Sequence, residues 1–104
     1  MKVNIESLHF KADDGLVLFI NEKIEKLKEH NNQIISSDVI LRLGKRPENK
    51  IVEIKLNCDG CNFYAKKTSE TFEKTTDMVI EALRRQLRKY KTKTIVKKRK
   101  IKGV

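Results

Sequence analysis

Residues 51–66, IVEIKLNCDGCNFYAK, decide the fold because they predict a β-hairpin whose register can be read from the sequence. Asp59-Gly60 is typical of a two-residue hairpin loop, in which a type I′ turn requires positive φ at both central positions. The turn pairs apolar residues with apolar residues and polar residues with polar ones: Cys58 with Cys61, Leu56 with Phe63, Ile54 with Ala65, Lys55 with Tyr64, and Glu53 with Lys66. The agreement of both faces predicts an antiparallel pair with one buried face.

Two more strands are expected before the hairpin. KVNIESLH at 2–9 alternates between apolar and polar residues, and IISSDVILRL at 34–43 is rich in β-branched residues. GKRPENK at 44–50 contains the only proline and separates the second strand from the hairpin. The residues expected to face the core are Val3, Ile5, Val39, Leu41, Leu43, Val52, Ile54, Leu56 and Cys58.

Two segments have the periodicity of amphipathic helices, one at 11–32 and one from Phe72 to about Tyr90. Asp13 or Asp14 can cap the start of the first helix. In the second helix the acidic residues come early and the basic residues late, an order that complements the helix dipole. The apolar stripes are Leu16, Phe19, Ile20, Ile24 and Leu27 in the first helix, and Phe72, Thr76, Val79, Ile80, Leu83, Leu87 and Tyr90 in the second.

The expected element order is therefore β-α-β-β-β-α, an α+β fold. The first strand, helix and second strand imply a parallel, right-handed crossover, and the next two connections are hairpins. Because each strand has a single apolar face, we expect a four-stranded mixed sheet with both helices packed on one face. We expect one domain at 1–93, followed by a basic, flexible C-terminal tail at 94–104.

The positive charge is concentrated at the end of the chain. Segment 84–104 holds eleven of the 24 Lys and Arg residues and no Asp or Glu, whereas 1–83 has a formal charge of −1. A charge run is often only a solvated surface, but this complete segregation favours a polyanionic partner. No apolar run is long enough to span a membrane and no export signal is visible, so a cytoplasmic protein without a membrane partner is expected.

The cations of the two helices are the candidate binding residues. On a helical wheel those of the second helix fall opposite Leu83 and Leu87, and two lysines flank the apolar stripe of the first: Arg84, Arg85, Arg88 and Lys91, with Lys23 and Lys26. Such side chains bind phosphate oxygens without reading base sequence. Aromatic residues make up only 6% of the chain, so stacking on exposed rings is not expected. The predicted partner is folded RNA recognised by its backbone shape.

The Cys58-Asp59-Gly60-Cys61 motif has three possible roles: packing beside the turn, a cross-strand disulfide, or part of a metal site. Redox CxxC motifs lie at a helix N-terminus, whereas this motif is expected at a β-turn. Structural zinc needs four ligands, and the motif supplies only two. We therefore favour packing. No nucleophile elbow, phosphate loop or HExxH motif occurs. No catalytic residue, metal, cofactor or small-molecule substrate is therefore expected.

Four segments together resemble the ribosome hibernation-promoting factor family, which includes the ribosome-associated translation inhibitor Y. These are VNIESLHF at 3–10, INEKIEKLKEH at 20–30, VILRL at 39–43 and ALRRQLRKYK at 82–91. The resemblance covers roughly 1–93. Its most specific part is an L-x-R-Q-L-x-K-x-K pattern, matched by Leu83, Arg85, Gln86, Leu87, Lys89 and Lys91.

The resemblance implies a fold like that of double-stranded RNA-binding domains and a definite partner. Members bind the small ribosomal subunit in the channel used by mRNA and tRNA, so translation would be inhibited sterically and idle ribosomes preserved. Carried over by position, Lys23, Lys26, Arg85, Lys89 and Lys91 would face ribosomal RNA, and a monomer is expected off the ribosome.

The resemblance is incomplete in two places. Residues 71–77 match the family's usual start of the second helix only loosely. Long members also add a C-terminal domain that pairs ribosomes, whereas here a basic tail follows, so we expect no pairing through such a domain. The alternative interpretation is a general RNA- or DNA-binding protein that uses a basic helix.

Overall fold

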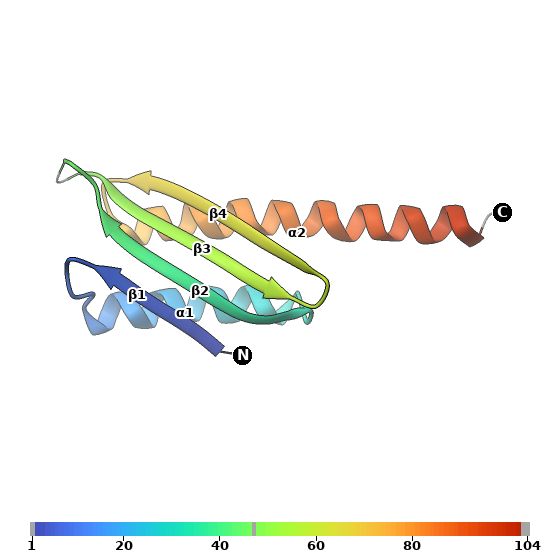
Figure 1. Ribbon diagram of the computed structural model, residues 1–104, viewed down its shortest axis with the longest axis horizontal. Helices are drawn as coiled ribbons and strands as arrows, with labels where there is room; N and C mark the ends of the chain where they lie inside the picture. The colour runs from blue at the N-terminus through green and yellow to red at the C-terminus, as the bar shows by residue number, and fades with distance from the viewer. Residues whose placement is uncertain (1, 47, 103–104) are drawn as a thin grey trace.

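The computed structural model describes residues 2–46 and 48–102, with side chains as far as Tyr90. The elements, drawn in Figure 1, are β1 (Lys2–Leu8), α1 (Asp14–Glu29), β2 (Ile34–Leu43), β3 (Lys50–Cys58), β4 (Cys61–Ser69) and α2 (Phe72–Lys102). The sheet order is β1-β2-β3-β4, with β1 parallel to β2 and the other pairs antiparallel. Both helices lie behind the same face of the sheet (Figure 1). The predicted α+β fold, with its mixed sheet and single helix layer, is confirmed.

The hairpin of β3 and β4 has the predicted register at every position named above, including Cys58 opposite Cys61 and Glu53 opposite Lys66. The prediction of a type I′ turn is wrong, because Gly60 has a φ of 86° whereas Asp59 is not among the described residues with positive φ. The register is unaffected, since it depends on the two-residue length of the loop and on matching apolar faces.

The core lies between the sheet and the helix layer. Its largest fully buried side chains come from α1, β2, β3 and α2: Ile20, Ile24, Leu27, Ile34, Val39, Leu41, Val52, Ile54, Leu56, Val79, Leu83 and Leu87. Two predicted core residues differ. Leu43 is 47% exposed because it is the last residue of β2, beside the 44–49 loop. Tyr90 is 39% exposed, although the edge of its ring contacts Phe63 with the centroids 5.5 Å apart.

Both helices begin at capping side chains. Asp13 accepts a hydrogen bond from the Leu16 backbone N–H at 2.7 Å, as predicted for the start of α1. Thr71 does the same for the N–H of Lys74 at the start of α2, at 3.1 Å.

The predicted end of the second helix near Tyr90 is wrong, since the backbone of α2 is helical to Lys102. No Gly or Pro occurs within α2 to stop it, and the next glycine is Gly103. Residues 94–102 of the predicted tail thus belong to α2, and residues 103–104 lie outside the described part. The mobility of this segment in solution stays a prediction.

Candidate nucleic-acid interface

The predicted cations lie on one layer of the molecule, because α1 and α2 pack side by side on the same face of the sheet. Lys23 is half-buried, and the other described members are exposed: Lys26, Arg84, Arg85, Arg88 and Lys89. The side chain of Lys91 lies outside the described residues. The structure therefore brings the cations of the two helices within one layer, as the wheel and the crossover together predict.

Lys23 links the two helices. Its Nζ is 3.1 Å from Oδ1 of Asp77 on α2, and it lies 5.3 Å from the centroid of the Phe19 ring. The side chains of Lys23 and Asp77 are 35% and 55% exposed, so solvent screens this ion pair and it contributes about 1 kcal/mol or less. Sequence analysis missed Asp77 as a partner because the two residues meet only when the helices pack together.

Glu81 is the acidic neighbour of two predicted binding residues. Its carboxylate oxygens lie 3.4 Å from Nη1 of Arg84 and 3.6 Å from Nε of Arg85. These contacts follow from the i,i+3 and i,i+4 spacing on a helix surface. One carboxylate therefore offsets part of the charge of two guanidinium groups, and the pairs also hold both side chains close to the helix.

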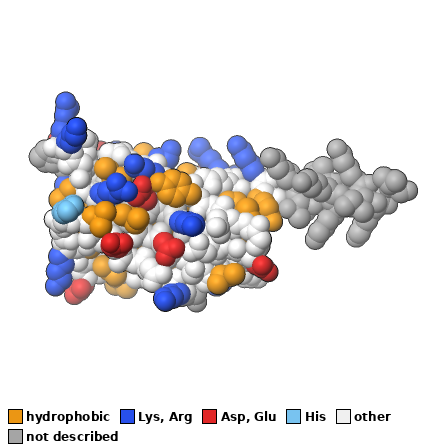
Figure 2. Space-filling model, in the orientation of Figure 1, with side chains coloured by type: hydrophobic (Ala, Val, Ile, Leu, Met, Phe, Trp, Pro, Cys, Tyr) orange, Lys and Arg blue, Asp and Glu red, His pale blue; other side chains and the backbone are white. Residues whose placement is uncertain are grey.

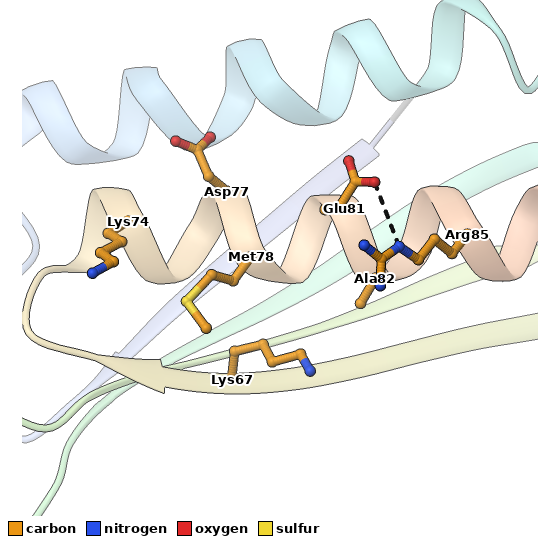
Figure 3. A pocket seen from close by; sticks show the side chains of 7 residues that line it. All are labelled: Lys67, Lys74, Asp77, Met78, Glu81, Ala82 and Arg85. Atoms are coloured by element: carbon orange, nitrogen blue, oxygen red, sulfur yellow. Dashed lines mark ion pairs between the residues drawn. The ribbon is translucent and has the colours of Figure 1, made fainter.

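The arginines of α2 line two different hollows. Arg84 and Arg88 line a hollow of about 180 Å³ with Leu87 and with His30, where α1 ends. Arg85 lines a second hollow, together with Lys67 of β4 (Figure 3). The wheel placed Arg84 and Arg88 opposite Leu87, but a side chain about 100° from the buried stripe borders the neighbouring helix instead.

Lys67 on β4 is a cation that sequence analysis missed. Its position in β4 has the same parity as Phe63 and Ala65, which face the core, yet Lys67 is exposed. It lies near the end of an edge strand and lines the hollow that also contains Arg85 (Figure 3). The sequence signal that could have identified Lys67 is a lysine at a core-face position of an edge strand.

The family-like motif in α2 combines packing and charge. Leu83 and Leu87 are buried in the core. Gln86 donates from Nε2 to the backbone carbonyl of Tyr64 at 2.8 Å, which ties α2 to β4. Arg85 and Lys89 are exposed. The leucines and the glutamine thus fix the helix, and the cations are the members of the motif that a partner can reach.

The two cysteines face each other across the hairpin turn as free thiols, both half-buried. Burial, together with the neighbouring Cys61, raises the pKa of the Cys58 thiol, which therefore stays protonated and weakly nucleophilic at neutral pH. Within residues 2–46 and 48–102, no group of three or more His, Cys, Asp or Glu side chains is placed to hold a metal ion. In the same part of the chain, no helix is apolar over a length that would cross a membrane.

On the open face of the sheet, which the helices do not cover, charged side chains are paired across neighbouring strands. Glu53, whose side chain is 10% exposed, accepts hydrogen bonds from Arg42 at 2.7 Å and from the Tyr64 hydroxyl at 2.9 Å, and Lys66 lies 3.8 Å away. Burial alone would raise the pKa of Glu53, but the bonds from Tyr64 and Arg42 outweigh it and lower the pKa. Figure 2 shows acidic and basic side chains close together on this face.

Comparison with known proteins finds relatives along most of the chain. The family described as "Sigma 54 modulation protein / S30EA ribosomal protein" matches residues 3–95. A ribosome hibernation promoting factor of Azotobacter vinelandii is 32% identical over 95 residues, covering 91% of this chain and 87% of the relative. One of Pseudomonas putida is 29% identical over 93 residues, or 89% of each chain. A ribosome hibernation promotion factor of Lactococcus lactis is 30% identical over 94 residues, and this chain spans 51% of that relative.

Solved structures show the same fold. A ribosomal subunit interface protein from Coxiella burnetii has a TM-score of 0.82 at 23% identity, over 88% of this chain and 99% of that one. The N-terminal domain of Thermus thermophilus Protein Y has a TM-score of 0.76 at 14% identity, over 86% and 99%. At these identities the likeness concerns the fold alone.

Proposed function

The chain belongs to the Sigma 54 modulation protein / S30EA ribosomal protein family, and on this premise we propose that it is a ribosome hibernation factor. It binds RNA of the small ribosomal subunit in the channel for mRNA and tRNA, and it inhibits translation by occupying that channel. Its relatives from A. vinelandii and P. putida carry the name ribosome hibernation promoting factor. Occupation makes and breaks no covalent bond, so this action needs no cofactor. In this proposal the protein acts in the cytoplasm and is a monomer before it binds.

One observation carries this proposal, namely the exposed cations that α1 and α2 present on a single layer. Lys26 on α1 and Lys89 on α2 are exposed and have no ion-pair partner within the described part of the chain. Their ammonium groups are therefore available to phosphate oxygens, which bind them by charge-assisted hydrogen bonds. Contacts of this kind position a protein on RNA without reading its sequence.

The ion pairs of Lys23, Arg84 and Arg85 are compatible with RNA binding. Solvent reaches each pair, since the side chains are 35% to 71% exposed, so exchanging a carboxylate partner for a phosphate costs about 1 kcal/mol or less. In this proposal the RNA contacts belong to the domain at 1–93, including Lys91. The basic segment at 94–104 adds affinity without specificity.

The test reverses the charge of one lysine on each helix. The resulting affinity is compared with that of a variant in which two lysines on the open face of the sheet are reversed. Lys26→Glu/Lys89→Glu is expected to lower affinity for small ribosomal subunits by at least about 100-fold, because two phosphate contacts become repulsions. The matched control is Lys2→Glu/Lys55→Glu, which alters two exposed lysines on β1 and β3. Both variants are measured by co-sedimentation with purified subunits, and circular dichroism checks that each is folded. If both variants bind ribosomes equally well, α1 and α2 are not part of the interface.

Competition separates this proposal from general nucleic-acid binding. A protein in the channel is displaced by tRNA and mRNA together, and it prefers small subunits to random duplex RNA at physiological salt. A general binder shows comparable affinity for both, with affinity falling by a log–log slope of about −0.7 to −0.9 for each phosphate neutralised. Comparable affinities would favour the general binder.

A further inference from the structure

The flank of α2 that faces β4 carries a groove of about 440 Å³ (Figure 3). Its floor is apolar, because Met78 lies in the middle of the groove and Ala82 lies one turn farther along the helix. Met78 is 38% exposed, so its thioether is accessible. Methionine sulfur makes favourable contacts with aromatic rings, and a volume of this size is within the range of small-molecule sites.

Cations surround this apolar floor on both sides. Lys67 reaches the groove from β4 and Arg85 from α2, and Lys74 lies near the start of the helix (Figure 3). Within the described residues, Lys67 has no ion-pair partner, whereas Lys74 pairs with Glu70 at 2.8 Å. The groove therefore places an unpaired ammonium group and a guanidinium group next to a surface that an aromatic base can cover.

The two carboxylates that border the groove are engaged from its other side. Asp77 pairs with Lys23 of α1, and Glu81 pairs with Arg84 as well as Arg85. In Figure 3 both carboxylates project toward α1, whereas Met78 and Lys67 lie on the β4 side. The acids thus face away from the floor. The charge of Asp77 is offset by Lys23, which lies outside the groove, and that of Glu81 is shared between Arg84 outside the groove and Arg85 within it.

We propose that this groove binds one unpaired nucleoside phosphate. The base covers Met78 and Ala82, and the phosphate lies between Lys67 and Arg85. This inference rests on the proposed function, since RNA then supplies the nucleotide, but a free nucleotide has the same chemistry. It adds contact with a base to a surface that otherwise binds only the RNA backbone, because a flipped base can be reached in a single strand and not in a duplex.

The first test measures affinity of the full chain for a labelled single-stranded RNA and for the same sequence as a duplex, by fluorescence anisotropy. Lys67→Glu is expected to weaken single-strand binding about tenfold and duplex binding less than threefold. The matched control, Lys55→Glu on the open face of β3, is expected to change both less than twofold. Equal losses on single strand and duplex would overturn the base-binding groove.

The second test concerns the floor. Met78→Ala is expected to weaken single-strand binding two- to tenfold, the size of a lost methionine–ring contact, and to leave duplex binding unchanged. Met78→Leu keeps the apolar surface and is expected to lose less. Thermal unfolding confirms that both variants are folded. No change in single-strand affinity for Met78→Ala would overturn the proposal, whatever the effect on ribosome binding.

The third test identifies the source of the nucleotide from the NMR signal of the Met78 methyl group. A shift on adding millimolar AMP supports a groove that accepts free nucleotides, and a shift with single-stranded RNA alone supports RNA as the source. No shift with either overturns the proposal. If the groove variants bind single-stranded RNA normally while Lys26→Glu/Lys89→Glu no longer binds ribosomes, the groove is wrong and the proposed function stands.

Discussion

The two faces of the molecule hold their charged side chains in different ways. On the open face of the sheet, Glu53 is surrounded by Arg42, Tyr64 and Lys66, which come from both neighbouring strands. On the helix layer, Lys26 and Lys89 have no ion-pair partner among the described residues. Cross-strand register places opposite charges side by side, whereas within one helix only residues three or four positions apart can pair.

Asp38, like Glu53, has partners on both neighbouring strands. Its two carboxylate oxygens accept hydrogen bonds from Asn4 on β1 and Asn57 on β3, each at 2.9 Å. These bonds lower the pKa of Asp38, with that from Asn4 having the larger effect. These polar groups of the sheet thus stabilise the fold, whereas Lys26 and Lys89 of the helix layer remain for a partner.

Among the changes that test this contrast between the two faces, Glu53→Ala is expected to have the largest effect, on the free energy of unfolding. The change leaves Arg42 and Tyr64 without their shared acceptor and should lower the free energy of unfolding by about 1–2 kcal/mol. Urea unfolding measures it. Glu6→Ala, at an exposed position of β1, is the control and should change stability by less than about 0.5 kcal/mol. Equal stability of the two variants would mean that the Glu53 cluster does not stabilise the sheet.

The free energy of unfolding should also depend on pH, to a smaller extent, because Glu53 and Asp38 are hydrogen-bonded in the folded sheet. The folded pKa values of Glu53 and Asp38 lie below their ordinary values of 4.5 and 3.8. The unfolded chain therefore takes up protons first as the pH falls, so the stabilisation is complete above about pH 5 and is lost progressively as the pH falls through the folded pKa values. Urea midpoints between pH 3 and 6 should show this loss.

The control for the titration is Glu53→Gln, which cannot be protonated in this range. It should flatten part of the pH dependence, because one of the two shifted carboxyl groups is absent. A slope identical to that of the unmodified protein would assign the acid sensitivity to other groups.

The smallest expected effect is on the helix layer. Glu81→Gln removes the carboxylate that Arg84 and Arg85 share, so RNA binding should tighten two- to threefold while stability changes by less than about 0.5 kcal/mol. Fluorescence anisotropy and urea unfolding measure the two quantities. Glu29→Gln, at an exposed position near the end of α1, is the matched control for charge alone. A tighter complex in both variants would indicate a general charge effect and not release of the arginines.

Much of the fold could be predicted from local patterns. The hairpin pairs of β3 and β4 were correct because a two-residue loop and alternating polarity leave one register in which both faces agree. Asp13, one of the two capping residues predicted for α1, was also confirmed for a local reason. The end of α2 was not, because a basic segment without Gly or Pro carries no stop signal.

The candidate site was predicted less completely. The wheel identified the exposed cations of α2 but not the hollows that they line, since it contains no neighbouring helix or strand. The Asp77 partner of Lys23 and the position of Lys67 beside Arg85 were both missed. Each requires a contact between residues that are far apart in the chain.

By itself the sequence determined the strands, the register of the β3–β4 hairpin and the change from acidic to basic residues along α2. These features depend on alternation, loop length and residue order, which act between near neighbours in the chain. Only the tertiary structure decided which cations are paired and which are available, and that a groove with an apolar floor lies between α2 and β4. The physical reason is that an ion pair or a groove needs two surfaces, and packing alone sets which surfaces meet.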